Sequence, residues 1–208
     1  MTSSIHPLDE ALALTSSAPG QFTGQTHPGY WNMVGPFGGV TAATLLQAVM
    51  QHPDRLGDPL SLTVNYAGAL TAGAFTVQAT PVRTNRSTQH WTLTILQADA
   101  EGAPVVTTTA TAVTAVRRDT WSAGDVPMPA VPGPTAHPAI EHGPEAMEWL
   151  NRYEMRPITG ALPRAWDGSG DHSLTQLWMR DAPARPLDFC ALSALADLFF
   201  PRVWLRRA

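Results

Sequence analysis

The 208-residue sequence has one cysteine, no lysine and no apolar run as long as a membrane span requires. The lone cysteine, Cys190, excludes a disulfide within the chain and fits a reducing compartment. A membrane span needs about 18 consecutive apolar residues. Residues 1–20 have neither the basic start nor the apolar core of a secretion signal. We therefore expect a cytoplasmic protein with no membrane partner.

Charge is also scarce in this chain. Only 14% of the residues are charged, all 13 cationic side chains are arginine, and the net charge is −4. Binding to nucleic acid rests largely on an excess of basic side chains, so nucleic acid is not an expected partner. The 44% hydrophobic content is typical of a globular protein, and the length allows one large domain or two small ones.

The first half of the chain contains one helical pattern followed by four strand patterns. Phe37–Asp54 places apolar residues at helical spacing, has Gly38 and Gly39 at its start, and ends near Pro53. Alternating apolar and polar residues then predict strands near 60–66, 75–82, 90–98 and 105–116. An antiparallel meander with one helix against it is an α+β arrangement and not a parallel βαβ one.

The composition changes between residues 119 and 146, where six prolines fall in a stretch with little periodicity. This composition predicts a linker. We divide the chain into an N-terminal domain at 1–118, a proline-rich linker at 119–146 and a C-terminal part at 147–208. The C-terminal part contains strand-like runs at 149–159 and 172–180 and a second helix at 187–200.

The two predicted helices resemble each other. Aligning residues 41–50 with residues 190–199 pairs Ala42 with Ala191 and Leu46 with Leu195, and it places Asp197 opposite Ala48. In both copies an aromatic residue and a short proline-containing turn precede the helix. We infer a tandem duplication whose second copy stops before its later strands.

On these features the chain resembles the TesB-like acyl-CoA thioesterases, which are double hot-dog proteins. The resemblance rests on the FGG at 37–39, the meander that contains residues 61–88 with its basic turn, and the late HSLTQLWMR and ALSALADL segments. It implies a tandem double hot dog, in which an antiparallel sheet wraps around each central helix, with the second unit incomplete.

The resemblance implies a catalytic role for Asp197. In the family, an aspartate on the second helix positions the attacking water together with a Ser or Thr and a Gln from later strands, and only the aspartate has a counterpart here. Helical spacing predicts that Asp197 lies away from the apolar face that should pack on a sheet. That face is expected to contain Leu192, Leu195 and Phe199. The alternative is an acid on the solvated side of a surface helix.

Two further groups of residues are candidate site residues. Gly38 and Gly39 leave the first amides of the helix open, so a backbone N–H can donate to the thioester oxygen, although close packing is an equally good reason for two glycines. Arg83, Asn85 and Arg86 lie near a hairpin tip and can contact the phosphates of coenzyme A. Exposed turns carry such residues in any case.

We therefore expect an acyl-CoA thioesterase that uses no cofactor, because coenzyme A is part of the substrate. No metal is expected, since His137, Glu141 and His142 lack a metal-motif spacing. One alternative is a non-catalytic acyl-CoA or acyl-chain binding protein, or a truncated inactive homologue. Another is a hot-dog dehydratase, which is disfavoured because no histidine follows the second helix. Hot-dog sheets commonly pair at their edges, so a homo-oligomer is expected.

Overall fold

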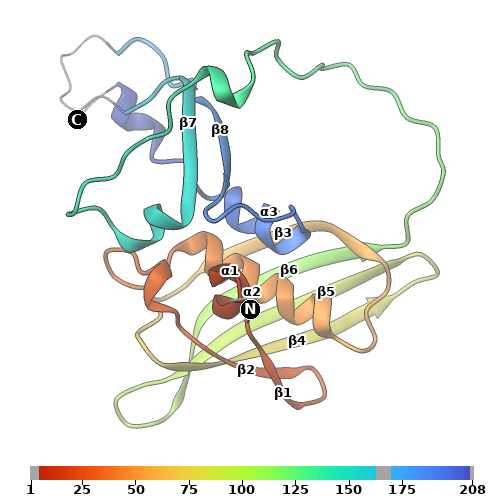
Figure 1. The fold of residues 1–208 in the computed structure, drawn as a ribbon. Coiled ribbons are helices and arrows are strands. Elements are labelled where there is room, and N and C mark those ends of the chain that lie inside the picture. The colour runs from red at the N-terminus through yellow and green to blue at the C-terminus, as the bar shows by residue number, and fades with distance from the viewer. Residues whose placement is uncertain (1–4, 163–169, 207–208) are drawn as a thin grey trace.

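The N-terminal part of the chain forms a six-stranded antiparallel sheet packed against one long helix (Figure 1). The structure, a computed structural model, describes residues 5–162 and 170–206. The short helix α1 (Pro7–Ala11) precedes the sheet, and α2 (Gly38–Gln51) is the central helix. The strand order is β1-β2-β4-β5-β6-β3. The strands are β1 (Thr15–Ala18), β2 (Gln21–Gln25), β3 (Asp58–Tyr66), β4 (Ala74–Thr84), β5 (Thr88–Ala98) and β6 (Pro104–Ala115).

The core of this unit lies between α2 and the sheet. On β5, Trp91, Leu93 and Ile95 alternate with exposed or partly exposed residues and are each 1% exposed, as a strand with one buried face requires. They pack in one cluster with Leu45 and Val49 of α2, which are fully buried. The apolar face of β5 and the apolar face of α2 therefore pack against each other, and these contacts fix the position of the helix on the sheet.

The C-terminal part forms a smaller layer over the same helix (Figure 1). It contains a two-stranded antiparallel sheet of β7 (Tyr153–Thr159) and β8 (Gln176–Asp181), followed by α3 (Phe189–Leu195). Single 3-10 turns stand at η1 (Pro28–Tyr30), η2 (Pro134–Ala136), η3 (Glu148–Arg152) and η4 (Arg202–Leu205). The middle of the linker contacts the small sheet, since Trp178 Nε1 donates to the carbonyl oxygen of Pro132 at 2.9 Å.

The predicted α+β arrangement is confirmed, and α2 lies inside the predicted helix at 37–54. The four predicted strands are present, but the expected four-stranded meander is wrong: only β4, β5 and β6 follow one another in the sheet, because β3 pairs with β6 and not with β4. The sequence patterns did not predict α1, β1 or β2. Among the described residues, no helix is long and apolar enough to cross a membrane.

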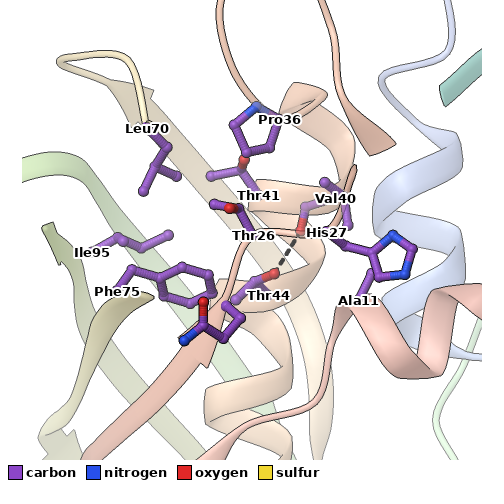
Figure 2. A pocket seen from close by; sticks show the side chains of 11 residues that line it. Ala11, Thr26, His27, Pro36, Val40, Thr41, Thr44, Leu70, Phe75 and Ile95 are labelled. Atoms are coloured by element: carbon purple, nitrogen blue, oxygen red, sulfur yellow. Dashed lines mark hydrogen bonds between the residues drawn. The ribbon is translucent and has the colours of Figure 1, made fainter. Parts of the chain in front are cut away.

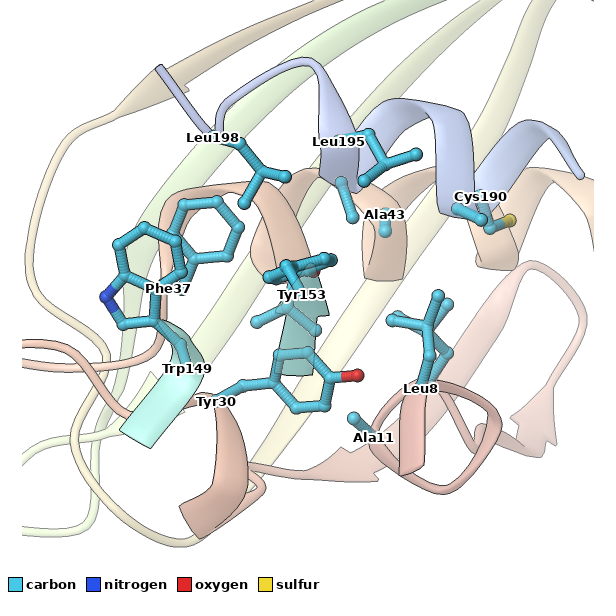
Figure 3. Packing of buried hydrophobic residues seen from close by; sticks show 14 of the residues in the cluster. Leu8, Ala11, Tyr30, Phe37, Ala43, Trp149, Tyr153, Cys190, Leu195 and Leu198 are labelled. Atoms are coloured by element: carbon cyan, nitrogen blue, oxygen red, sulfur yellow. The ribbon is translucent and has the colours of Figure 1, made fainter. Parts of the chain in front are cut away.

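Two expectations for the second helix are wrong. The helix is shorter than predicted: Asp188 accepts a hydrogen bond from Ala191 N–H at 2.7 Å and caps its start, and it ends at Leu195. The expected apolar face is also wrong, because Leu192 is 52% exposed and Phe199 is 41% exposed. The buried positions are Cys190, Ala191, Ala194 and Leu195. They pack against α2 instead of a sheet, and their mostly small side chains allow the two helices to approach closely (Figure 3).

Candidate active site

The candidate active site is built around the first turn of α2. The first N–H groups of an α-helix have no partner inside the helix and carry a partial positive charge. Phe37 precedes the helix and has no side-chain acceptor to cap it. Gly38 and Gly39 follow, so no side chain covers these amides from within α2.

Asp197 supplies the missing acceptor from the other part of the chain. It lies in the turn that follows α3, and its carboxylate accepts a hydrogen bond from Gly39 N–H. The two helices can come this close because Gly39 has no side chain: a methyl group built on it would lie 2.4 Å from the carbonyl oxygen of Ala194. Asp197 therefore caps α2 across the contact between the two units.

The electrostatics of Asp197 combine two opposing effects. Burial raises the pKa of this carboxyl, because neighbouring protein atoms remove water from the charged form, and the hydrogen bond from Gly39 lowers it. Burial is the larger effect, so the pKa lies above the ordinary value. The residue nevertheless keeps access to solvent. A partly desolvated carboxylate with solvent access can accept a proton from water.

Tyr66, the last residue of β3, approaches the same turn. Its hydroxyl donates a hydrogen bond to the carbonyl oxygen of Gly38 at 2.8 Å. Burial, and to a smaller extent the negative charge of Asp197, raises the pKa of this hydroxyl to about 12. The strand pattern gave no sign of this contact, because it joins the end of β3 to a helix that precedes it in the chain.

A large apolar cavity opens beside these groups. It has a volume of about 470 Å³, and both Gly38 and Asp197 line it. Most of its wall is aromatic or aliphatic and comes from the C-terminal part. The wall includes Phe37, Met147, Trp149, Leu150, Met155, Leu177, Leu198, Phe199, Phe200 and Trp204. The rings of Phe37 and Trp149, which both line the cavity, stack at a centroid distance of 4.3 Å (Figure 3). This contact joins the wall of the cavity to the start of α2.

Two other cavities differ in size and character. One of about 410 Å³ is lined by Tyr66, Asn32 and Thr108, among others, and shares Asn32 and Met33 with the apolar cavity. The other, inside the N-terminal unit, measures only about 20 Å³ (Figure 2). Its wall includes Thr44, whose hydroxyl already donates to Val40 O at 2.8 Å. A space of that size holds one water and no substrate.

The basic turn lies away from this site. Arg83 Nε donates to Asn85 Oδ1 at 3.0 Å, and Arg86 is exposed in the same turn between β4 and β5. Close by, Gln89 donates to the carbonyl oxygen of Asp54 at 3.0 Å, just beyond the end of α2. Because α2 rises about 1.5 Å per residue, its two ends lie about 20 Å apart. The structure thus brings Gly38, Gly39 and Asp197 together and leaves the basic turn apart from them.

Neither the thiol of Cys190 nor a group of metal ligands forms a second centre in the described part of the chain. Cys190 is buried, its Sγ lies 3.2 Å from Gln47 Oε1, and burial raises the pKa of its thiol to about 12. A thiol in that state is a poor nucleophile. Within residues 5–162 and 170–206, no three His, Cys, Asp or Glu side chains are grouped so as to hold a metal ion.

Comparison with known proteins finds two matching family descriptions. Residues 27–115 match the acyl-CoA thioesterase N-terminal domain, and residues 124–208 match the acyl-CoA thioesterase C-terminal domain. No curated protein sequence matches the chain.

Solved structures share the architecture. A conserved hot-dog protein of unknown function from Alicyclobacillus acidocaldarius is 48% identical over 98% of this chain and 73% of its own, with a TM-score of 0.85. The acyl-CoA thioesterase II TesB2 of Mycobacterium marinum is 21% identical, with a TM-score of 0.67 over 92% of this chain and 68% of its own. The tesB protein of Mycobacterium avium subspecies paratuberculosis is 17% identical, with a TM-score of 0.63 over 93% and 68%. The predicted hot-dog fold is thereby confirmed.

Proposed function

Because the chain belongs to the TesB-like acyl-CoA thioesterase family, we propose that it hydrolyses an acyl-CoA thioester to a free acid and coenzyme A, with Asp197 as the base. The observation that carries the proposal is the position of Asp197. Its carboxylate stands at the start of α2 and on the wall of an apolar cavity of about 470 Å³. A thioester bound there has its acyl group in the cavity and its carbonyl carbon near the carboxylate.

The reaction needs only the substrate and water. Asp197 accepts one proton from a water as the water oxygen attacks the carbonyl carbon. The carbon–sulfur bond then breaks, the thiolate of coenzyme A leaves with the electron pair, and the proton held by Asp197 is returned to it. No redox or group-transfer cofactor takes part in these steps.

The start of α2 can assist by stabilising the developing oxyanion. Gly39 N–H is engaged by Asp197, and Gly38 N–H is the amide that precedes it at the helix start, where the first N–H groups have no partner inside the helix. Gly38 is therefore the donor that we assign to the thioester oxygen, in the partial positive field of the helix start. The loss of one such donor typically lowers kcat by about 10²- to 10³-fold.

The apolar cavity predicts a preference for longer acyl groups. Each methylene removed from water contributes about 0.8 kcal/mol, which is about fourfold in kcat/KM. The specificity constant should therefore rise about fourfold per added methylene and level off once the cavity is filled.

The test is release of free thiol from a series of acyl-CoA substrates of increasing chain length. The wild-type chain is compared with Asp197→Asn, which keeps the size and an acceptor oxygen but cannot take up a proton. We expect kcat to fall by about 10²- to 10⁴-fold in this variant. Asp125→Asn, in an exposed part of the linker, is the matched control and should retain full activity.

One observation favours a second candidate, a protein that binds acyl-CoA without hydrolysing it. Asp197 already has a structural partner in Gly39 N–H, so its carboxylate can be explained as a helix cap alone. Calorimetric binding of a non-hydrolysable acyl-CoA thioether, with no thiol released from any acyl-CoA, would establish this alternative. Turnover that Asp197→Asn leaves intact would instead refute the assignment of the base.

A further inference from the structure

Tyr66 stands at the candidate site, and the proposed reaction gives it no role. It pairs with Thr108 of β6 at the end of β3, and about half of its surface is exposed. Tyr66 also lines the cavity of about 410 Å³, which shares Asn32 and Met33 with the apolar one. The residue is thus open to a ligand on one side and fixed by a hydrogen bond on the other.

The geometry around Gly38 brings Tyr66 and Asp197 together. A methyl group built on Gly38 would lie 2.6 Å from Asp197 Oδ2 and 3.2 Å from the Tyr66 hydroxyl oxygen. Both oxygens therefore face the same side of the Gly38 Cα from different elements, β3 and the turn after α3. Replacing this glycine by any other residue would put a Cβ atom close to both of them.

The hydrogen of the Tyr66 hydroxyl already forms a hydrogen bond within the protein. It is donated to the carbonyl oxygen of Gly38 at 2.8 Å, so the hydroxyl oxygen faces its surroundings as an acceptor. A raised pKa of about 12 keeps the group protonated at neutral pH, so it does not act as a base. It is a fixed, neutral acceptor beside a carboxylate.

A water that attacks a carbonyl carbon uses a lone pair, and both of its hydrogens then need acceptors. We propose that Tyr66 is a catalytic residue that accepts the second hydrogen of the attacking water while Asp197 accepts the first. Two acceptors fix the orientation of the water, so that its lone pair points to the thioester. Tyr66 neither gains nor loses a proton; the hydrogen it accepts stays on the oxygen that becomes part of the acid. This assignment rests on the proposed thioesterase activity.

The first test compares wild type with Tyr66→Phe, which removes only the hydroxyl. We expect kcat to fall about 10- to 100-fold, the range for a hydrogen bond to a reacting group, with KM changed less than about twofold. Tyr30→Phe is the matched control, since the Tyr30 hydroxyl is buried and has no hydrogen-bond partner among the described residues. In the double variant with Asp197→Asn, the two effects should combine to less than their product, because both groups hold one water.

A second readout does not depend on how much of the variant is folded. Methanol carries a single hydroxyl hydrogen, so as a nucleophile it needs Asp197 and not Tyr66. In mixtures of methanol and water, Tyr66→Phe should raise the ratio of methyl ester to free acid above the wild-type ratio. A purely structural hydroxyl would leave this ratio unchanged.

The outcomes separate this inference from the proposed function. If wild type and Tyr66→Phe show the same kcat and the same product ratio, while Asp197→Asn is inactive, the role of Tyr66 is refuted and the thioesterase stands. A rise in KM at constant kcat would also refute it, and would make Tyr66 a contact to coenzyme A. If wild type releases no thiol from any acyl-CoA, the proposed function fails and the role of Tyr66 fails with it.

Discussion

Gly38→Ala is the change that most directly tests the geometry of the site. The added methyl group would lie 2.6 Å from Asp197 Oδ2 and 3.2 Å from the Tyr66 hydroxyl. The backbone of Gly38 is helical, so alanine is compatible with its conformation and favours the helix by up to about 1 kcal/mol. The methyl group therefore contacts the side chains of Asp197 and Tyr66 and does not strain the backbone of α2.

The expected loss of activity in Gly38→Ala depends on which atoms must move to make room for the methyl group. The contact with Asp197 is far shorter than carbon and oxygen tolerate, so the flexible carboxylate has to shift, while the fold has no reason to rearrange. A displacement of about 1 Å at a reacting group can cost about 100-fold in rate. We expect kcat/KM to fall by about 10- to 100-fold and the free energy of unfolding to change by no more than about 1 kcal/mol.

Two other glycine variants make the measurement specific. In Gly39→Ala the new methyl group would lie 2.4 Å from the backbone oxygen of Ala194, so the two helices must separate and the protein should lose about 1 to 3 kcal/mol of stability. Gly124→Ala meets nothing within 4 Å and should be silent in both assays. The assays are thiol release and urea unfolding. A Gly38→Ala protein with wild-type kcat/KM would show that the reaction does not take place beside this turn.

Two further predictions concern charge and packing. The pKa of Asp197 is raised in the folded chain, so its ionised form is disfavoured there, and stability is lost as the pH rises through that pKa. Urea unfolding should therefore find Asp197→Asn at least as stable as wild type near pH 7, and the difference in stability should vanish near pH 4. The kcat of wild type should fall as the pH drops through the same raised pKa, because the protonated carboxyl cannot act as a base. Trp149→Ala removes the ring stacked on Phe37 at 4.3 Å and should lower the free energy of unfolding by about 3 to 5 kcal/mol in urea. The control is Trp121→Ala, which should leave the free energy of unfolding unchanged because Trp121 is 85% exposed. Equal losses of stability in the two variants would contradict the packing argument.

The parts of the fold that were predictable are those where one face is buried and the other is not. Along β5, the alternation of buried Trp91, Leu93 and Ile95 with more exposed residues is visible in the sequence as a period of two. β1 (Thr15–Ala18) is exposed along its whole length and carries no apolar alternation, so the same reasoning could not find it. Its position depends on pairing with β2, for example Thr15 with Thr23.

The site was predictable in part. Asp197 was identified as a candidate through the family and Gly38 and Gly39 through their place at the start of a predicted helix, and the structure brings them together at the start of α2. Tyr66 was missed because its partner Gly38 is separated from it by the rest of α2, a loop and β3, and no periodicity reports such a contact. The face of α3 was misassigned for a related reason: the pattern shows which residues are apolar but not whether a sheet or a helix will cover them.

The two repeated helices have different residues at matching positions, Ala48 and Asp197, because different parts of the protein cover them. The position in α2 that corresponds to Asp197 is Ala48, which is fully buried against the sheet with Leu45 and Val49. A carboxylate there would be an unpaired charge in an apolar core, at a cost of several kcal/mol. Asp197 instead lies just past the end of α3, where it keeps solvent access and has a backbone donor in Gly39. One N–H donor lowers the cost of the charge without removing it, and the remaining desolvation keeps the carboxylate more basic than an ordinary aspartate. The Gly39 contact thus lets this position tolerate an acid, while burial gives that acid the properties of a base.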